Sequence, residues 1–530
     1  MSPHDYQARL GLAYAPSDYQ CAIFDWVTTG RGHRAIRAVA GAGKTASVIA
    51  AAKLIVGDGL FVAFNKDIAT ELGKRLVGTP MRASTLHAHG FAAIRYRFPG
   101  VRVAGEKYQA EIDGLEQDVL AGRLLGRSLS QDEADVVHEE GYPRSAVAKL
   151  LDFARLDLVH EGAPEFRDLL LGLADHHDVD VAEELQDVVV ASVRHLLGWG
   201  KANTSTIDFA DMVWLPIALR LRPKRYSWVF VDEAQDLSRA TLRLVELSLA
   251  AGGRAVFVGD PRQAINGFAG ADCDAWDRVL DFTGAPELPL SVCYRCPSSV
   301  VDLARTLCPE IEARPGAPVG HVRTSTRKAF VADAREGDMV LCRRNAPLLG
   351  MAFALIAEGV SACVKGRDIA SGLSKIVEKV GKRCRRFDEF PAKLAAWADG
   401  KRTATAKRFK DADKAAEACT AIDDQAECIR IIADRSGARG TKSLVTAIDD
   451  LFRDGPASVT CSSIHKSKGL EADRVFILEP EKLANPRGFG WQLEQERNLA
   501  YVAYTRAKSE LVEIVEAVES PAEPAVEGAP

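Results

Sequence analysis

The sequence lacks the features that mark secreted and membrane proteins. It contains no apolar run near the roughly 18 residues that a membrane-spanning helix requires. Residues 1–14 show no basic region followed by an apolar stretch, so no signal peptide is expected. The 11 cysteines are scattered apart from Cys293 and Cys296, and a zinc site there would need two further ligands at suitable spacing. We therefore expect reduced thiols, no bound zinc and a cytoplasmic protein without a membrane partner.

The chain also lacks an overall basic charge. Its 68 Lys and Arg are outweighed by 73 Asp and Glu, which gives a net charge of -5 and a pI of about 6.2. A basic excess is the usual electrostatic signature of a nucleic-acid-binding protein, so any such surface must be local. The most basic stretch is residues 371–410, with roughly twelve Lys and Arg against four Asp and Glu.

Short apolar runs alternate with helix-forming stretches along much of the chain. This alternation predicts an α/β fold with parallel sheets flanked by helices. The expected strands are residues 35–40, 60–64, 228–231, 255–258, 339–342, 362–365 and 475–478. The expected domains are residues 1–95 with 204–287, a helical insertion at 96–203, residues 288–372 with 455–515, a short basic helical insertion at 373–454, and a disordered Pro-, Glu- and Ala-rich tail at 516–530.

A glycine-rich loop follows the apolar run 35–40 and precedes a helix-forming stretch at 47–55. Strand, glycine-rich loop and helix form the setting of a Walker A loop, whose backbone N–H groups wrap phosphates. Lys44 would reach the β- and γ-phosphates, and the Thr45 hydroxyl would hold Mg²⁺. Ala38 replaces the first Gly of the general pattern. The nucleotide-binding residues are Gly41, Ala42, Gly43, Lys44, Thr45 and Ala46.

Two acidic residues follow the apolar stretch 229–231. Asp232 would complete the Mg²⁺ shell together with Thr45, and Glu233 would orient or deprotonate the attacking water. Paired acids after a strand are often only a solvated strand end. Here they follow a Walker A loop by about 190 residues, in the order that P-loop enzymes use. The loop and the acids together predict hydrolysis of ATP with Mg²⁺.

The residues 232–236 read Asp-Glu-Ala-Gln-Asp, and this chain resembles the UvrD/Rep-like superfamily 1 DNA helicase family. The other motifs of that family follow in order over nearly the whole chain. They are Gln20, residues 63–66 (motif Ia), 85–90 (Ib), 208–212, 258–263 (III), 294–295 (IV), 464–471 (V), and 496–499 with 501–508 (VI).

The resemblance implies two RecA-like motor domains with ATP between them. Within that arrangement, Gln263 would sense the γ-phosphate, and Arg295 and Arg506 would act as arginine fingers. The remaining implied nucleotide contacts are Tyr294 stacked on the adenine, Gln20 opposite it, and Glu471 on the ribose.

Single-stranded DNA would bind through stacked aromatics and polar groups, with 3′ to 5′ movement implied by the family. The candidate contacts are Phe64, Asn65, Thr85, His87, Phe268 and His465. Each of the aromatic and histidine candidates can also be read as a core residue. The chain departs from the family at Asn266, where a Tyr is frequent, and at Ala269, where an Arg is frequent. These departures predict a weaker grip on the bases and leave the ATP site unaffected.

The second insertion is shorter than that of full-length relatives, and its basic residues allow more than one interpretation. Lys379, Lys382, Arg383, Arg385 and Arg386 could contact duplex phosphates or a protein partner, or could form a solvated helical face.

Three functions follow from the sequence. The leading one is an ATP-dependent helicase that acts on single-stranded and tailed duplex DNA in repair, recombination or replication. The alternative is a DNA-stimulated translocase that strips proteins from DNA or serves a partner nuclease, as in phage or defence systems. A nucleotide-gated scaffold fits less well, because it would not need Glu233, Arg295 and Arg506.

Overall fold

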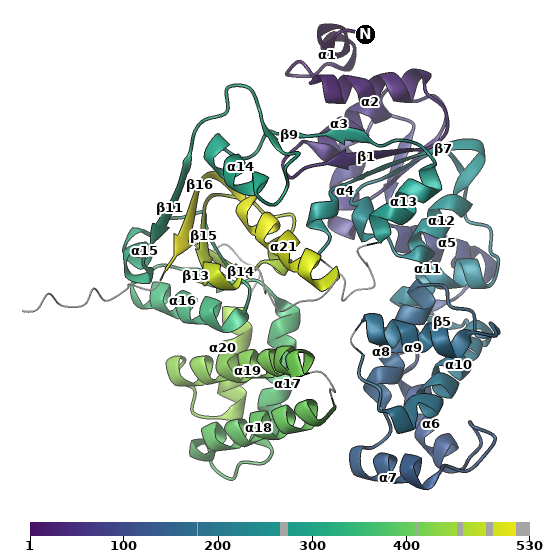
Figure 1. The fold of residues 1–530 in the computed structure, drawn as a ribbon, viewed down its shortest axis with the longest axis vertical. Coiled ribbons are helices and arrows are strands. Elements are labelled where there is room, and N and C mark those ends of the chain that lie inside the picture. The colour runs from purple at the N-terminus through teal and green to yellow at the C-terminus, as the bar shows by residue number, and fades with distance from the viewer. Residues whose placement is uncertain (178, 266–273, 409–411, 453–458, 484–490, 516–530) are drawn as a thin grey trace, which may run out of the picture. The chain divides into compact units, whose positions relative to one another are not determined.

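The computed structural model describes residues 1–177, 179–265, 274–408, 412–452, 459–483 and 491–515. The chain forms two compact units, Met1–Cys293 and Tyr294–Pro530 (Figure 1). Among the described residues, no helix combines the length and the apolar character needed to cross a bilayer. The expected disordered tail, residues 516–530, lies outside the described part of the chain.

The first unit contains a six-stranded sheet in which every described strand pairs in parallel with its neighbour. Its strands in spatial order are β3 (Met81–Ser84), β2 (Gly59–Val62), β6 (Tyr226–Val231), β7 (Leu249–Gly259), β1 (Arg34–Ala38) and β8 (Leu288–Leu290). The central strands are apolar because helices cover both faces of a parallel sheet, and Val229, Phe230 and Val231 are fully buried. The expected parallel α/β fold is confirmed.

The strand β8 corrects one expected boundary. Residues 288 onward are expected in the second domain, but Leu288 pairs with Ile36 of β1, and the first unit extends to Cys293. Three residues carry too little pattern to reveal their partner strand. Pro289 has no backbone N–H to donate, which suits the edge position that β8 takes.

Five helices, α6 to α10, form a bundle at one end of the first unit (Figure 1). They are α6 (Gln109–Leu120), α7 (Gln131–Glu140), α8 (Arg144–Leu156), α9 (Phe166–His176) and α10 (Gln186–Ala202). Their core includes Leu150 and Val193 and continues into α11 (Phe209–Ala218) through Leu215. The helix α5 (Leu86–Arg97) crosses the boundary that is expected at 95/96.

Buried charges join this bundle to α11. Lys107 Nζ lies 2.6 Å from Asp211 Oδ2, and Arg155 Nη1 lies 2.9 Å from Asp211 Oδ1. Arg155 also pairs with Asp208, which caps α11 in a capping box with Asp211. Because both acids of this first turn are held, the helix start has a fixed position against the bundle.

The second unit contains another six-stranded parallel sheet. Its strands in spatial order are β11 (His321–Ser325), β16 (Ala507–Ile514), β15 (Ala472–Leu478), β12 (Asp338–Cys342), β14 (Val459–Ser463) and β13 (Ala362–Val364). The helices α14 (Ser298–Arg305), α15 (Arg327–Asp333), α16 (Asn345–Ala357) and α21 (Trp491–Tyr504) belong to the same unit. Two parallel α/β sheets agree with two RecA-like domains.

The second insertion is helical, as expected; it packs on α16 and shares a hydrophobic core with its own unit (Figure 1). Its helices are α17 (Arg367–Gly381), α18 (Phe390–Arg408), α19 (Ala412–Arg435) and α20 (Thr441–Leu451). Asp424 of α19 accepts the backbone N–H groups of Asn345 and Ala346 at 3.1 and 2.9 Å. The insertion thus supplies the N-terminal cap of α16, a helix of the motor domain.

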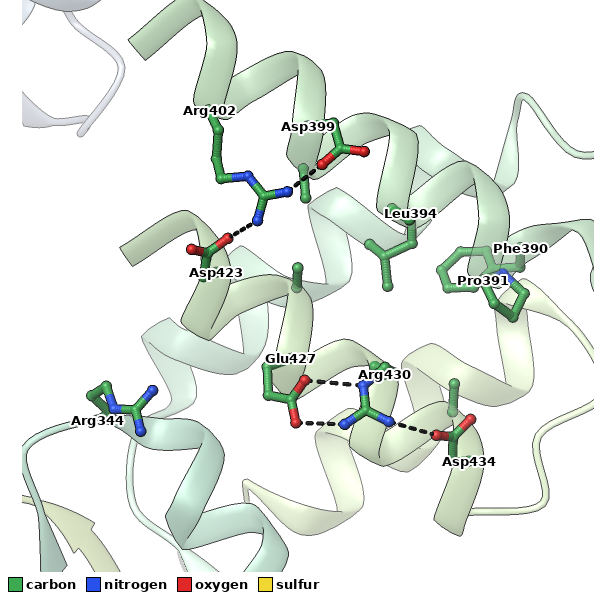
Figure 2. Close-up of a pocket in the computed structure, with 14 residues that line it drawn as sticks. Arg344, Phe390, Pro391, Leu394, Asp399, Arg402, Asp423, Glu427, Arg430 and Asp434 are labelled. Atoms are coloured by element: carbon green, nitrogen blue, oxygen red, sulfur yellow. Dashed lines mark hydrogen bonds and ion pairs between the residues drawn. The ribbon is translucent and has the colours of Figure 1, made fainter. Parts of the chain in front are cut away.

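A pocket of about 460 Å³ lies along α18 and α19 (Figure 2). Its floor is apolar and includes the buried side chains of Phe390 and Leu394. Its rim carries two ion-paired groups, Arg402 with Asp399 and Asp423, and Arg430 with Glu427 and Asp434. Each guanidinium group lies between two carboxylates, so the pocket offers apolar surface inside an ion-paired rim with an excess of acidic groups.

Candidate nucleotide and nucleic-acid sites

The predicted phosphate loop connects β1 to α3 (Lys44–Ala52). Gly41 and Gly43 have φ angles of 68° and 73°, a region that glycine enters without steric cost. Gly43 is the N-cap of α3, and no described side chain caps that helix start. Backbone N–H groups at the start of a helix are a suitable anion site. Gly41, Ala42, Gly43, Lys44, Thr45 and Ala46 all lie in this loop and first turn, as expected.

The two predicted acids lie beside the loop because β6 and β1 flank β7 in the sheet. Thr45 Oγ1 donates to Asp232 Oδ2 at 2.8 Å, and Lys44 Nζ lies 3.4 Å from Glu233 Oε1. Burial raises the pKa of Asp232 to about 6, and the charge of Glu233 adds to this effect. Oxygen ligands from a hydroxyl and a carboxylate fit Mg²⁺, so Thr45 and Asp232 can hold that ion.

Glu233 has a φ angle of 54°, in the left-handed region that non-glycine residues rarely adopt. Strained backbone of this kind is found mostly at functional sites. The conformation turns the chain between Asp232 and the short 3₁₀ turn η2 (Ala234–Asp236). It allows two consecutive carboxylates to serve the same site.

A third carboxylate, Asp260, lies within the predicted motif III at 258–263, although no role was predicted for it. It follows β7, is buried, and accepts from Gln263 Nε2 at 2.6 Å. Burial raises its pKa, and the charge of Lys44 opposes that shift. Its signal in the sequence was its place after an apolar strand, the same place that identified Asp232. Gln263, the predicted γ-phosphate sensor, is thereby fixed beside the acids of the site.

Gln20 is buried and braces the phosphate loop. Its Nε2 donates to Ser47 Oγ at 2.8 Å, and Ser47 Oγ donates to the carbonyl of Gly43 at 2.9 Å. Its Oε1 accepts the N–H of Ser17 at 3.0 Å and completes the capping box of α2 (Asp18–Thr29). The adenine contact expected of Gln20 stays a prediction.

The predicted residues of the second unit come together around Arg295. Its Nε lies 2.7 Å from Glu471 Oε2, and its Nη1 donates to the carbonyl of Thr505 at 3.1 Å. Arg506 is buried, and its guanidinium donates to the carbonyls of Val502 and Leu470. Tyr294 is 38% exposed. Residues from motifs IV, V and VI therefore share one site, with both arginines held by backbone oxygens.

Several predicted nucleic-acid contacts follow the ends of β2 and β3, which are neighbours in the first sheet. Phe64 is 54% exposed. Asn65 caps α4 (Lys66–Arg75) and Thr85 caps α5, so both side chains are engaged by backbone N–H groups. Phe268, with the departures at 266 and 269, lies outside the described residues.

The structure adds Phe209, which the sequence did not single out. Phe209 is 66% exposed at the start of α11, and its ring centroid lies 5.8 Å from that of His87. The two aspartates on either side of it, at 208 and 211, are anchored by the helical bundle. The signal available in the sequence was an aromatic between two acids within the family-like segment 208–212. His87 and Phe209 form an aromatic pair at the surface of the first unit.

His465 belongs to the second unit, in the turn after β14. Burial lowers its pKa to about 4, and the charge of Arg343 contributes. The ring is therefore neutral at pH 7, and in this form it can hydrogen-bond or stack.

Comparison with known families matches residues 22–281 to the UvrD/REP helicase N-terminal domain and residues 458–512 to the UvrD-like helicase C-terminal domain. The chain belongs to the UvrD/Rep-like helicase family. The N-terminal match contains the phosphate loop, Asp232, Glu233 and Gln263, and the C-terminal match contains His465, Glu471 and Arg506. Gln20, Tyr294 and Arg295 lie outside both matches.

The curated relatives of this UvrD/Rep-like chain carry helicase names. It is 24% identical over 518 residues to F-box DNA helicase protein 1 of Schizosaccharomyces pombe, which covers 90% of this chain and 55% of that protein. It is 25% identical to ATP-dependent DNA helicase UvrD2 of Mycobacterium tuberculosis over 91% of this chain and 76% of that protein. The match to DNA helicase II of Escherichia coli is 31% identical over 21% of this chain and 16% of that protein. The chain thus spans about half the length of the Schizosaccharomyces pombe protein. The shorter match covers a smaller share of the Escherichia coli protein.

Proposed function

We propose that this protein is an ATP-dependent DNA helicase or translocase that moves along single-stranded DNA. The observation that carries the proposal is the cluster of Lys44, Thr45, Asp232 and Glu233 beyond the ends of β1 and β6, the two strands that flank β7. The helicase names of the relatives support the choice of DNA as the polynucleotide.

In this proposal, Lys44 binds the β- and γ-phosphates, and Thr45 and Asp232 hold Mg²⁺. The metal supplies charge neutralisation for the phosphates when it is bound. Glu233 accepts the proton of the attacking water. Gln263, hydrogen-bonded to Asp260, senses the γ-phosphate. Before nucleotide binds, Lys44 forms an ion pair with Glu233. When nucleotide binds, Lys44 contacts a phosphate instead of Glu233.

Arg295 and Arg506 act as the arginine fingers, which are worth about 10³–10⁵ in rate in related systems. Arg506 would then leave the two carbonyls that hold it. Tyr294 stacks on the adenine, Gln20 reads it, and Glu471 contacts the ribose, as the family resemblance implies.

Single-stranded DNA stacks on Phe64 and on the His87–Phe209 pair, with His465 and Phe268 as further contacts. Stacking of one base on an aromatic side chain is worth about 1–3 kcal/mol. Because Asn65 and Thr85 use their side-chain oxygens as helix caps, we assign them mainly to positioning the two helix starts. Movement is 3′ to 5′, and the work belongs to repair, recombination or replication.

Tailed duplex DNA contacts a basic surface formed by Lys379, Lys382, Arg383, Arg385 and Arg386. All five are exposed, and of them Arg386 pairs with Asp388 at 3.3 Å. The surface extends towards the start of α20, because Gly381 lies against Thr441. Phosphates of a duplex are the partner that such a cationic surface fits.

The test is ATP hydrolysis with and without single-stranded DNA, with Lys44→Ala as the blank and Phe209→Ala as the DNA-contact variant. We expect strong stimulation in the wild type, loss of hydrolysis in Lys44→Ala, and a several-fold higher DNA concentration for half-stimulation in Phe209→Ala. Duplexes with 3′ or 5′ tails then report unwinding and direction. Stimulation without unwinding would favour the translocase, and hydrolysis near zero with or without DNA would favour the scaffold.

A further inference from the structure

Gln235 joins two loops of the candidate ATP site. Its side chain is fully buried in η2. Its Nε2 donates to Glu233 Oε2, and its Oε1 accepts the backbone N–H of Asp260 at 3.0 Å. Because the N–H of Asp260 requires an oxygen, the NH₂ group of the amide must face Glu233. The amide therefore satisfies both neighbours in one orientation.

The hydrogen bonds continue from Asp260 to Gln263. Asp260 Oδ2 accepts from Gln263 Nε2 at 2.6 Å, and Oδ1 accepts the N–H of Arg262 at 3.1 Å. Hydrogen bonds thus connect the Glu233 carboxylate to Gln235, Gln235 to the backbone of Asp260, and the Asp260 carboxylate to the side chain of Gln263. They link the ends of β6 and β7, two neighbouring strands.

Gly259 leaves the space that Gln235 occupies. A Cβ atom at position 259 would lie 2.5 Å from Gln235 Oε1 and 2.8 Å from Trp276 Cζ3. Both distances are below van der Waals contact. Any side chain at 259 would therefore displace the amide from between Glu233 and Asp260.

We propose that Gln235 is a positioning residue that aligns the Glu233 carboxylate for hydrolysis and transmits its position to Gln263. This inference rests on the proposed function. Glu233 Oε1 faces Lys44, whereas Oε2 faces Gln235. When a phosphate takes Lys44, the bond from Gln235 still fixes the carboxylate. The amide of Gln235 neither gains nor loses a proton, and Glu233 remains the group that accepts the proton of the water.

The first variant is Gln235→Met, which keeps the length of the side chain and removes the amide. We expect kcat for ATP to fall roughly 10- to 100-fold, because a hydrogen bond to a charged group is lost where the reaction occurs. KM for ATP should stay within about threefold, because the phosphate loop is untouched. The ratio of DNA-stimulated to basal hydrolysis should fall towards one, because the position of Gln263 is no longer coupled to that of Glu233.

Gly259→Ala is the second variant, since it displaces the same amide without removing it. We expect the same fall in kcat at nearly constant KM. Gln131→Met is the matched control, because the Gln131 amide donates to Asp135 at the surface of α7. Circular dichroism and the melting temperature establish that each variant is folded.

The inference is overturned if folded Gln235→Met and Gly259→Ala keep the wild-type kcat and stimulation ratio. It is also overturned if kcat, KM and melting temperature change together, as a general loss of structure would cause. A wild type that hydrolyses ATP without DNA stimulation overturns the proposed function instead. In that case basal hydrolysis still tests the alignment of Glu233, and an unchanged kcat in Gln235→Met overturns it.

Discussion

Asp232 is a residue whose ionisation conflicts with its buried surroundings. Burial raises its pKa from 3.8 to about 6, so the folded protein holds this proton more tightly than the unfolded chain does. Its contribution to stability is present below about pH 4 and is lost as the pH rises through about 6. In the proposed function, this cost at neutral pH keeps the carboxylate ionised for a metal ion.

Asp232→Asn should therefore melt at a higher temperature than the wild type at pH 8, without Mg²⁺ and nucleotide. The expected gain is on the order of 2 kcal/mol, and it should shrink as the pH falls to 5. The amide can still bond to Thr45 and to the N–H of Glu233. Thermal unfolding across pH 5 to 8 measures this, with exposed Asp302→Asn as the control. A gain that stays constant over this range would contradict the raised pKa.

The residue types of the site could be predicted from sequence, but their partners could not. Lys44, Thr45, Asp232 and Glu233 belong to short local motifs, so the pattern located them. The bonds of Gln20 to Ser47 and of Gln235 to Asp260 join separate segments. No local pattern encodes such pairs, because they depend on which strands become neighbours. Phe209 was missed for a related reason, since its exposure depends on how the bundle holds α11.

At the scale of elements, the cap on α16 comes from another part of the chain. Asp424 accepts from Asn345 and Ala346, whereas its neighbour Asp423 is exposed and pairs with Arg402 at 2.6 Å. Asp424→Ala should cost about 2 kcal/mol, because it leaves buried N–H groups at a helix start without a partner. Asp423→Ala should cost less than about 1 kcal/mol.

Thermal unfolding and amide hydrogen exchange at Ala346 measure the difference between these adjacent aspartates. Faster exchange at Ala346 is expected in Asp424→Ala alone. Equal loss of stability in both variants would mean that the cap does not attach the insertion to the motor domain.

The central residues of a strand could be predicted from the sequence wherever a buried strand appears as a continuous apolar run. The seven expected strands are all confirmed, five of them within one or two residues, whereas β7 and β15 begin earlier, at Leu249 and Ala472. Within the two six-stranded sheets, β3, β8, β11, β14 and β16 were not identified. In β11 four of five residues are exposed and the apolar signal is weak, because it lies at the edge of the sheet.

At the scale of the whole molecule, the net charge of -5 opposes binding to DNA, so affinity must come from local cationic surfaces. The quadruple change of Lys382, Arg383, Arg385 and Arg386 to Glu should weaken binding to tailed duplexes. It should also flatten the dependence of affinity on salt, by roughly 0.9 in the log–log slope for each phosphate that the variant no longer neutralises.

A variant with Gln at the same four positions is the matched control. It removes the positive charges without adding negative charges that repel the DNA phosphates. Gln should flatten the slope to the same extent with a smaller loss of affinity. Unchanged affinity and slope in both variants would identify the surface as a solvated face, and loss of binding to a protein with intact DNA binding would identify a protein partner.

The strands β13 and β14 pair in parallel although residues 365–458, the whole second insertion, separate them. In kinetic terms, this pairing closes a very long loop. The conformational entropy of that loop must be lost before the pairing of β13 with β14 can stabilise the fold. Folding should therefore gather α17 to α20 first, and β13 and β14 should meet late. During synthesis β14 and β15, the two neighbours of β12, leave the ribosome only after the insertion, so β12 stays unpaired on both edges until then. The unpaired edges of β12 are where a slowly folding chain would associate with a second copy.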